Sequence, residues 1–288
     1  MRKTLPATVV IMGFALATPL LADNSTSTVF QSNSGNLVDV NLAGAIAGAQ
    51  SLIDQSGANN VANVTQFDDG SDIGGVAPPI NDSTILQAGD GNSATLMQDT
   101  STFQLFSASY IEQIGDNNSA VVTQYDDAQD SSIAQISDGN TAIVIQGDSL
   151  LALTDESYGN SSSIVQDGLG GHYAEISQTG LLNTSEITQF GENNTIYVAQ
   201  LGDFNDSFAS QDGVGHWAEI SQSGDGNLSE LFQIGNGHEA YLVQLGNSNY
   251  SMIDQSGSGN WASVSQSSDN NTSIVIQSGA NNTAQVSQ

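Results

Sequence analysis

Glutamine recurs every eleven residues along the C-terminal part of the chain, and this period constrains the fold more than any local preference. From Gln178 to Gln288 the spacing never slips. A fixed repeat of this kind is typical of solenoids, in which each repeat adds one unit to a continuous stack. Within each period the sequence reads Gln-x-Gly-x-x-Asn-x-small-x-aliphatic-x, as it does from Gln255 to Gln266. The alternating part predicts a β-strand, and the part around the glycine predicts a turn.

The small residue two places before the aliphatic one alternates between two identities, so the true repeat has 22 residues. Ser251 and Ser273 belong to one series, Ala262 and Ala284 belong to the other, and Ile196 departs from the alternation. Two strands per repeat describe one rung of a coil that returns over its own start. The sequence therefore predicts an all-β fold: a two-sheet β-solenoid of about 11 strand-turn-strand rungs, stacked as in cross-β, amyloid-like structures.

Each strand has an inward and an outward face, because residues two apart point the same way. In the unit that contains Asn260, Ala262, Val264 and Gln266, these four residues are expected to face inward and Trp261 outward. Stacked rungs place each amide above its counterpart, which predicts hydrogen-bonded ladders. The expected ladder residues are Gln55, Asn60, Gln66, Gln113, Asn118, Gln124, Gln255, Asn260, Gln266, Gln277, Asn282 and Gln288. Glycines with positive φ are expected in the turns at Gly57, Gly89, Gly115, Gly202, Gly257 and Gly279.

The chain divides into three segments by pattern. Residues 1–22 carry Arg2, Lys3 and an apolar stretch, and they predict a secretory signal peptide. Residues 23–50 predict an N-terminal segment with one degenerate rung, and residues 51–288 predict the repeat solenoid.

Three irregular stretches interrupt the period of the solenoid. They lie at residues 67–77, near 99–105 and near 147–156, and loops are expected at all three.

Composition excludes several classes of function. Arg2 and Lys3 are the only basic residues against 31 Asp and Glu, and the net charge is −29. Nucleic-acid binding depends on cations that neutralise phosphates, so it is not expected. No apolar run after the leader is long enough to span a membrane as a helix, and the chain has no cysteine for disulfides or thiolate metal sites. No catalytic motif is present, so an enzyme is not expected.

The repeat resembles the curlin repeat of curli fibre subunits, Ser-x-aliphatic-x-Gln-x-Gly-x-x-Asn-x-Ala-x-aliphatic-x-Gln. Two full examples run from Ser109 to Gln124 and from Ser251 to Gln266. The resemblance implies a bacterial extracellular functional amyloid that builds pilus-like biofilm and adhesion fibres on the cell surface. It implies three partners: further copies of the chain, a curli nucleator or co-subunit, and an outer-membrane secretion pore.

An uncapped stack of strands also favours self-assembly. Neither end of the repeat array shows an obvious polar cap, and uncapped strand edges template further strands. End-to-end polymerisation is therefore expected. This chain has about twice the usual number of repeats and lacks cations, so a major subunit and a nucleator or minor subunit both remain open. A monomeric acidic β-solenoid adhesin is a further alternative.

Aligned carboxylates on one edge of the stack are candidates for a weak Ca²⁺ site. Like charges about 5 Å apart repel by on the order of 1 kcal/mol in water, and bound calcium or salt would relieve this repulsion. The candidate ligands are Asp116, Asp138, Asp203 and Asp225. Solvated turn acids that limit lateral clumping are the alternative. No other cofactor is expected.

The three histidines and the outward aromatic residues each have two interpretations. His172, His216 and His238 occupy the Asn position of one column, where they either replace Asn in the ladder or form a metal or pH-sensitive pair. The outward aromatic residues either form an adhesive stripe or reflect β-propensity alone. These residues are Tyr173, Tyr197, Phe208, Trp217, Tyr241 and Trp261.

Overall fold

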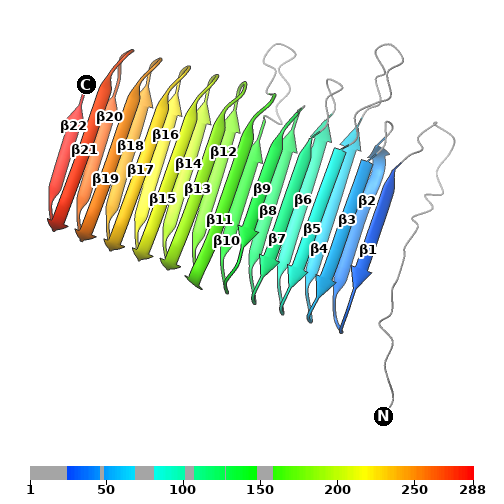
Figure 1. The fold of residues 1–288 in the computed structure, drawn as a ribbon. Helices are drawn as coiled ribbons and strands as arrows, with labels where there is room; N and C mark the ends of the chain where they lie inside the picture. The colour runs from blue at the N-terminus through cyan, green and yellow to red at the C-terminus, as the bar shows by residue number, and fades with distance from the viewer. Residues whose placement is uncertain (1–24, 46–48, 69–80, 101–106, 127, 148–157) are drawn as a thin grey trace, which may run out of the picture.

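The computed structural model describes residues 25–45, 49–68, 81–100, 107–126, 128–147 and 158–288, which form a two-sheet β-solenoid (Figure 1). The predicted signal peptide at residues 1–22 lies outside the described residues. The described part contains no helix, and so none that is long and apolar enough to cross a membrane.

Odd-numbered and even-numbered strands separate into two parallel sheets of eleven strands each. Sheet A consists of β1 (Thr26–Gln31), β3 (Ala49–Ser56), β5 (Asn81–Ala88), β7 (Ala108–Ile114), β9 (Asp130–Gln135), β11 (Ser161–Gly170), β13 (Thr184–Glu192), β15 (Asp206–Val214), β17 (Leu228–Asn236), β19 (Tyr250–Ser258) and β21 (Thr272–Ala280). Sheet B consists of β2 (Leu37–Ala45), β4 (Val61–Asp68), β6 (Ser93–Thr100), β8 (Ser119–Tyr125), β10 (Thr141–Gln146), β12 (Tyr173–Thr179), β14 (Thr195–Leu201), β16 (Trp217–Ser223), β18 (Glu239–Leu245), β20 (Trp261–Gln266) and β22 (Thr283–Ser287).

Each strand pairs with the strand two positions on, so every residue lies above its equivalent in the next repeat. Gln233 in β17, for example, aligns with Gln255 in β19, which is 22 residues later. The predicted fold class, with two strands per rung and 22 residues per rung, is confirmed. The pairing shifts register at two places, between Asn41 and Gly44 in β2 and between Gly168 and Gly170 in β11.

The core is a thin double layer between the two sheets. Inward positions of regular strands are fully buried, as shown by Ile253 in sheet A and Ala262 and Val264 in sheet B, none of which exceeds 1% exposure. Ile196, which breaks the Ser/Ala alternation, is also fully buried in the same apolar cluster. The prediction of the inward face is confirmed for the unit from Asn260 to Gln266, in which Trp261 points outward.

Two of the three expected loops begin later in the sequence than predicted. Residues 67 and 68 belong to β4, and residues 99 and 100 belong to β6, because both strands continue their pairing past the ladder glutamine. Residues 69–77, 101–105 and 148–156 lie outside the described part of the chain. Each of these segments follows a strand of sheet B and precedes a strand of sheet A. The strand ends that flank them therefore lie at the same edge of the solenoid (Figure 1).

Candidate functional site

Buried glutamines form one continuous ladder along each sheet. In sheet A, Gln55 Nε2 donates to Gln87 Oε1 at 2.7 Å, and Gln255 Nε2 donates to Gln277 Oε1 at 2.8 Å. The second N–H of the same amide reaches the opposite sheet, where Gln255 Nε2 donates to the Glu239 carbonyl oxygen at 3.1 Å. Each amide therefore ties successive rungs together and also ties sheet A to sheet B. Gln66, Gln113, Gln124, Gln266 and Gln288 occupy equivalent positions.

All these amides donate in one direction, from each rung to the rung that follows it in the sequence. A neutral buried hydrogen bond contributes about 1 kcal/mol to stability, and a buried amide left without a partner costs more than that. The ladder therefore favours addition of a matching rung over an empty edge.

The turns that connect a strand of one sheet to the next strand of the other sheet are called arches here. Asparagines at the arches form a second kind of ladder. The backbone N–H of Asn92 donates to Asn60 Oδ1 at 2.9 Å, and Asn60 Nδ2 donates to the Gly89 carbonyl oxygen at 2.8 Å. Asn118 accepts from Asn140 N, and Asn282 N donates to Asn260 Oδ1, in the same way. The side chain thus replaces the backbone acceptor that the arch cannot supply.

The arch glycines are required by space as well as by backbone conformation. Gly57 has a φ of 102°, and a Cβ atom there would lie 1.9 Å from the Gly89 carbonyl oxygen of the next rung. An alanine at this position would force adjacent rungs apart. Gly89, Gly115, Gly202, Gly257 and Gly279 also have positive φ.

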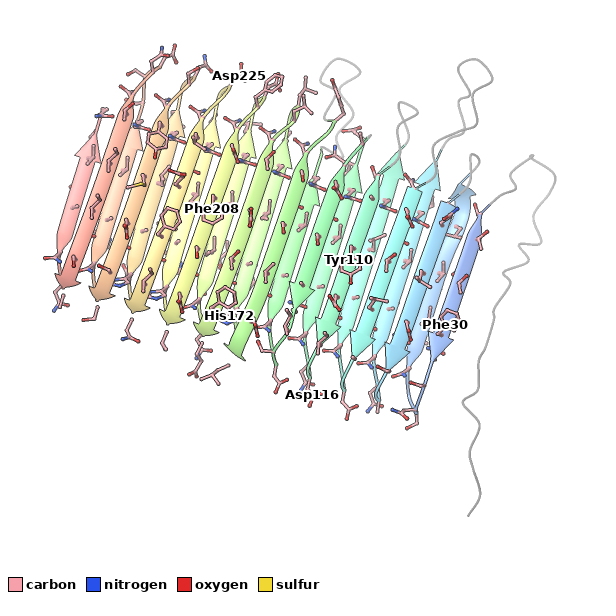
Figure 2. The ribbon with its side chains drawn as sticks, viewed as in Figure 1. Phe30, Tyr110, Asp116, His172, Phe208 and Asp225 are labelled. Atoms are coloured by element: carbon pink, nitrogen blue, oxygen red, sulfur yellow. The ribbon has the colours of Figure 1, made fainter. Side chains whose placement is uncertain are left out.

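The acidic columns lie at two opposite edges of the solenoid, so the expectation of one acidic edge is wrong (Figure 2). The reason is that Asp116 and Asp138 follow sheet A strands, whereas Asp203 and Asp225 follow sheet B strands. Asp116 N donates to Asp138 Oδ1 at 2.8 Å, and Asp203 N donates to Asp225 Oδ1 at 3.0 Å. One oxygen of these acceptor carboxylates is therefore held by backbone. Among the described residues, no group of three His, Cys, Asp or Glu side chains is placed to hold a metal ion.

Each histidine accepts a backbone N–H from the next rung and lies within hydrogen-bond distance of a carbonyl oxygen of its own turn, as Asn194 does in the same column. His216 Nδ1 accepts the backbone N–H of His238 at 3.2 Å, and His238 Nδ1 accepts that of Asn260 at 3.1 Å. His216 Nε2 lies 3.3 Å from the Asp212 carbonyl oxygen, which requires Nε2 to carry the proton. Burial lowers the pKa of His216 to about 4, and burial lowers the pKa of His172 as well. Because both ring nitrogens are occupied, the column has no free lone pair for a metal.

Five outward aromatic residues of sheet B form a continuous chain of rings. Centroids lie 5.2 Å apart for Tyr173 and Tyr197, 6.3 Å for Tyr197 and Trp217, 4.6 Å for Trp217 and Tyr241, and 6.2 Å for Tyr241 and Trp261. We call this set the aromatic ladder.

Phe208 is not part of the aromatic ladder. It lies on sheet A, where it packs against Phe232 with ring centroids 5.5 Å apart.

The two end rungs leave strand edges open. At the C-terminal end β21 pairs only with β19 and β22 pairs only with β20. Val286 is partly exposed, whereas its counterpart one rung earlier, Val264, is 1% exposed. No strand of the described chain covers this apolar position.

The N-terminal rung differs from the C-terminal rung in a way that was missed from the sequence. The pairing of β2 with β4 runs to Asn41 and Thr65 and resumes at Gly44 and Phe67, so Leu42 and Ala43, and no glutamine, lie opposite Gln66. Gln66 Oε1 is buried without a hydrogen-bond partner among the described residues. Counting eleven residues on from Gln31 reaches Leu42, and this count could have revealed the break.

Comparison with known families identifies one repeat. The model of the curlin associated repeat matches four overlapping segments, residues 183–213, 191–224, 217–246 and 240–267. These segments cover the strands from β13 to β20, where both arches are regular. No curated protein matches the chain.

Proposed function

Since the chain is a curlin-repeat protein by its residues 183–267, we propose that it is a structural subunit of an extracellular, curli-type amyloid fibre that grows by end-to-end stacking of solenoids. The curlin repeat is a structural unit rather than an enzymatic one, and it supports this class of role. Biofilm matrix formation and surface adhesion are the uses proposed for the fibre.

The open C-terminal rung is the observation that carries the proposal. It offers the same inward pattern as the rung before it, with Ser273, Val275 and Gln277 on β21 and Ala284 and Val286 on β22. A second copy that places its first rung on these strands would bury the exposed apolar atoms and pair two strand edges at once. The same contact is available at each new tip, so growth does not close on itself.

Export and surface location are part of the proposal. Residues 1–22 would direct the chain out of the cytoplasm, and an outer-membrane pore would release it at the cell surface. A nucleating co-subunit would present a first rung for the chain to join.

The experiment that tests the proposal blocks the open edges without removing an internal hydrogen bond. In a parallel ladder, backbone groups of successive residues point to alternate sides. Gln288 N donates back to Ser265 O, so the N–H of Gln285 faces the free edge. The Asn271 carbonyl oxygen accepts from Tyr250 N, so the N–H of Ile274 also faces the free edge. Proline at both positions would remove donors that only a neighbouring copy uses.

We expect the Ile274→Pro/Gln285→Pro variant to keep its β-sheet circular dichroism but to lose most fibre formation, measured by light scattering, electron microscopy and the cross-β reflection at about 4.7 Å. The matched control is Ile274→Ala/Gln285→Ala, which keeps both N–H groups and should polymerise like the wild type. Fibres from the proline variant at the wild-type rate, or a wild-type chain that stays monomeric, would contradict end-to-end assembly and favour a monomeric solenoid.

A further inference from the structure

From β14 to β20, four rings of the aromatic ladder and two carboxylates form a checkerboard in two neighbouring columns. Glu219 aligns with Tyr197 on one side and with Tyr241 on the other, in the same column. In the neighbouring column, Glu239 aligns with Trp217 and with Trp261. Each of these two glutamates therefore sits between two rings on adjacent strands, and we call the surface of these six residues the aromatic-acidic face.

The rings and carboxylates of this face are available to a ligand. Tyr197 is 37% exposed, Glu219 and Glu239 are exposed, and Trp217, Tyr241 and Trp261 are half-buried with their side chains on the outer side of sheet B. End-to-end stacking uses strand edges and leaves this outer side uncovered, so the face stays open in a fibre as well.

The carboxylates have no countercharge within the chain. Beyond residue 3 the sequence contains neither lysine nor arginine, and the three histidines lie buried in the arch column. Glu219 and Glu239 therefore cannot form an ion pair with Lys or Arg in the described structure. Paired charges must come from outside the molecule.

We propose that the aromatic-acidic face binds an extended, arginine-rich segment of a partner protein. A guanidinium group stacks on an aromatic face and also pairs bidentately with a carboxylate, and the checkerboard supplies both surfaces within one rung spacing of about 5 Å. Arginine fits this combination better than lysine, because its planar group uses the ring and the carboxylate together.

Charge argues against other occupants. A second copy of the chain would bring its own carboxylates against Glu219 and Glu239, and like charges repel. Nucleic acid and anionic lipid are repelled for the same reason. A neutral polysaccharide could stack on the rings but would leave the carboxylates without a countercharge.

Tryptophan fluorescence reports on this face alone, because Trp217 and Trp261 are the only two tryptophans of the chain. The experiment titrates the full chain with an octa-arginine peptide, and in parallel with octa-lysine, at about 0.15 M and about 0.5 M salt, since the higher salt screens the diffuse acidic field. We expect a saturable change in emission that persists at the higher salt with octa-arginine and is several-fold weaker in affinity with octa-lysine.

Two variants separate stacking from charge. Tyr197→Leu/Tyr241→Leu keeps the apolar area, the carboxylates and both tryptophans, and it should weaken octa-arginine binding by about tenfold. Glu219→Gln/Glu239→Gln keeps the rings and should weaken binding by a similar factor. The matched control, Glu186→Gln/Asp254→Asn, removes two carboxylates from the outer side of sheet A and should change affinity less than about twofold.

Circular dichroism checks that each variant keeps the solenoid. Equal binding of octa-lysine and octa-arginine, together with no loss in the leucine variant, would overturn the proposal in favour of non-specific charge attraction. A tryptophan response to a neutral β-linked glucan oligosaccharide without a response to octa-arginine would overturn it in favour of a carbohydrate surface. Both readouts are independent of fibre formation, so a failure here leaves the proposed function untouched.

Discussion

At the residue scale, a buried imidazole takes the place of a buried amide without a break in the ladder. His216 receives a backbone N–H at Nδ1 and offers Nε2 to a carbonyl, as Asn60 does with Oδ1 and Nδ2. The rings of His216 and His238 stack with centroids 5.0 Å apart and planes 4° apart. Protonation of Nδ1 would replace an acceptor with a donor that faces a backbone N–H. The hydrogen bonds of the fold therefore require the neutral form of the His216 imidazole.

The free energy of unfolding should therefore decrease when the pH is lowered, because the fold favours the neutral form of the buried imidazole. His216 has a pKa of about 4 in the fold, and an unfolded histidine titrates near 6.5. Below about pH 6.5 the unfolded chain binds more protons than the folded chain, so the free energy of unfolding decreases as pH falls toward 4. Between pH 7 and pH 4, we expect the His216→Asn variant to lose less stability than the wild type, by on the order of 2 kcal/mol. Urea unfolding followed by circular dichroism from pH 7 to pH 4 measures the difference.

A matched control is Asn194→Gln, which alters an amide in the same column but introduces no titratable group. Parallel pH profiles for the wild type and His216→Asn would show that the histidine column does not carry the acid sensitivity.

At the scale of a strand, β2 is the exception that shows what the glutamine contributes. Leu42 supplies no amide to Gln66, and the pairing of β2 with β4 shifts register between Asn41 and Gly44. The sheet B ladder therefore begins one rung later than the sheet A ladder, in which Gln31 Nε2 already donates to Gln55 Oε1 at 2.7 Å.

Leu42→Gln should extend the sheet B ladder into the first rung. The new Nε2 would donate to Gln66 Oε1, and satisfying this buried acceptor should stabilise the fold by about 1 kcal/mol. Thermal unfolding of the soluble chain measures the change. Leu42→Met, which has similar volume but no donor, is the control, and equal melting temperatures for the two variants would refute the expected hydrogen bond.

At the scale of the whole molecule, a net charge of −29 opposes the association that the open edges favour. Acidic columns run along both edges of the solenoid, and each new copy adds further charge to them. Repulsion of this kind acts over roughly a Debye length, which falls from about 30 Å at 0.01 M salt to about 8 Å at 0.15 M.

Raising NaCl from about 0.01 M to about 0.15 M should therefore shorten the lag of fibre assembly several-fold. Thioflavin fluorescence and light scattering follow the time course. Calcium at matched ionic strength tests the predicted Ca²⁺ ligands, because a larger acceleration than NaCl that is lost in Asp203→Asn/Asp225→Asn would show binding at that column. A lag that does not respond to salt would show that charge repulsion does not limit assembly.

Much of this architecture could be predicted because one period governs every level. The spacing of Gln233, Gln244 and Gln255 implies strand length, sheet number and register together, since stacked rungs must align identical residues. The arrangement of the aromatic ladder was not predicted. It depends on rings in two neighbouring columns, and only the pairing of adjacent strands shows that Tyr197 lies between Tyr173 and Trp217.

The hydrogen bonding of the inward serines could not be predicted from the repeat pattern. The Ser/Ala alternation was visible in the sequence, but it did not reveal that the Ser207 and Ser229 hydroxyl oxygens are buried without a hydrogen-bond partner in the described structure. Ser131 Oγ, by contrast, donates to Ser109 Oγ at 3.1 Å. The difference depends on side-chain rotamers, which a repeat motif does not specify.

The one-way donation of the glutamine amides gives any fibre built from this chain a plus end and a minus end. The leading tip would present the one amide hydrogen of Gln277 that is not donated to the Trp261 carbonyl oxygen, whereas the trailing tip would present the Oε1 acceptor of Gln31 beside the apolar Leu42. Seeds marked at each tip should accordingly lengthen at unequal speeds, and a filament anchored to a surface by one tip would extend outward only from the other.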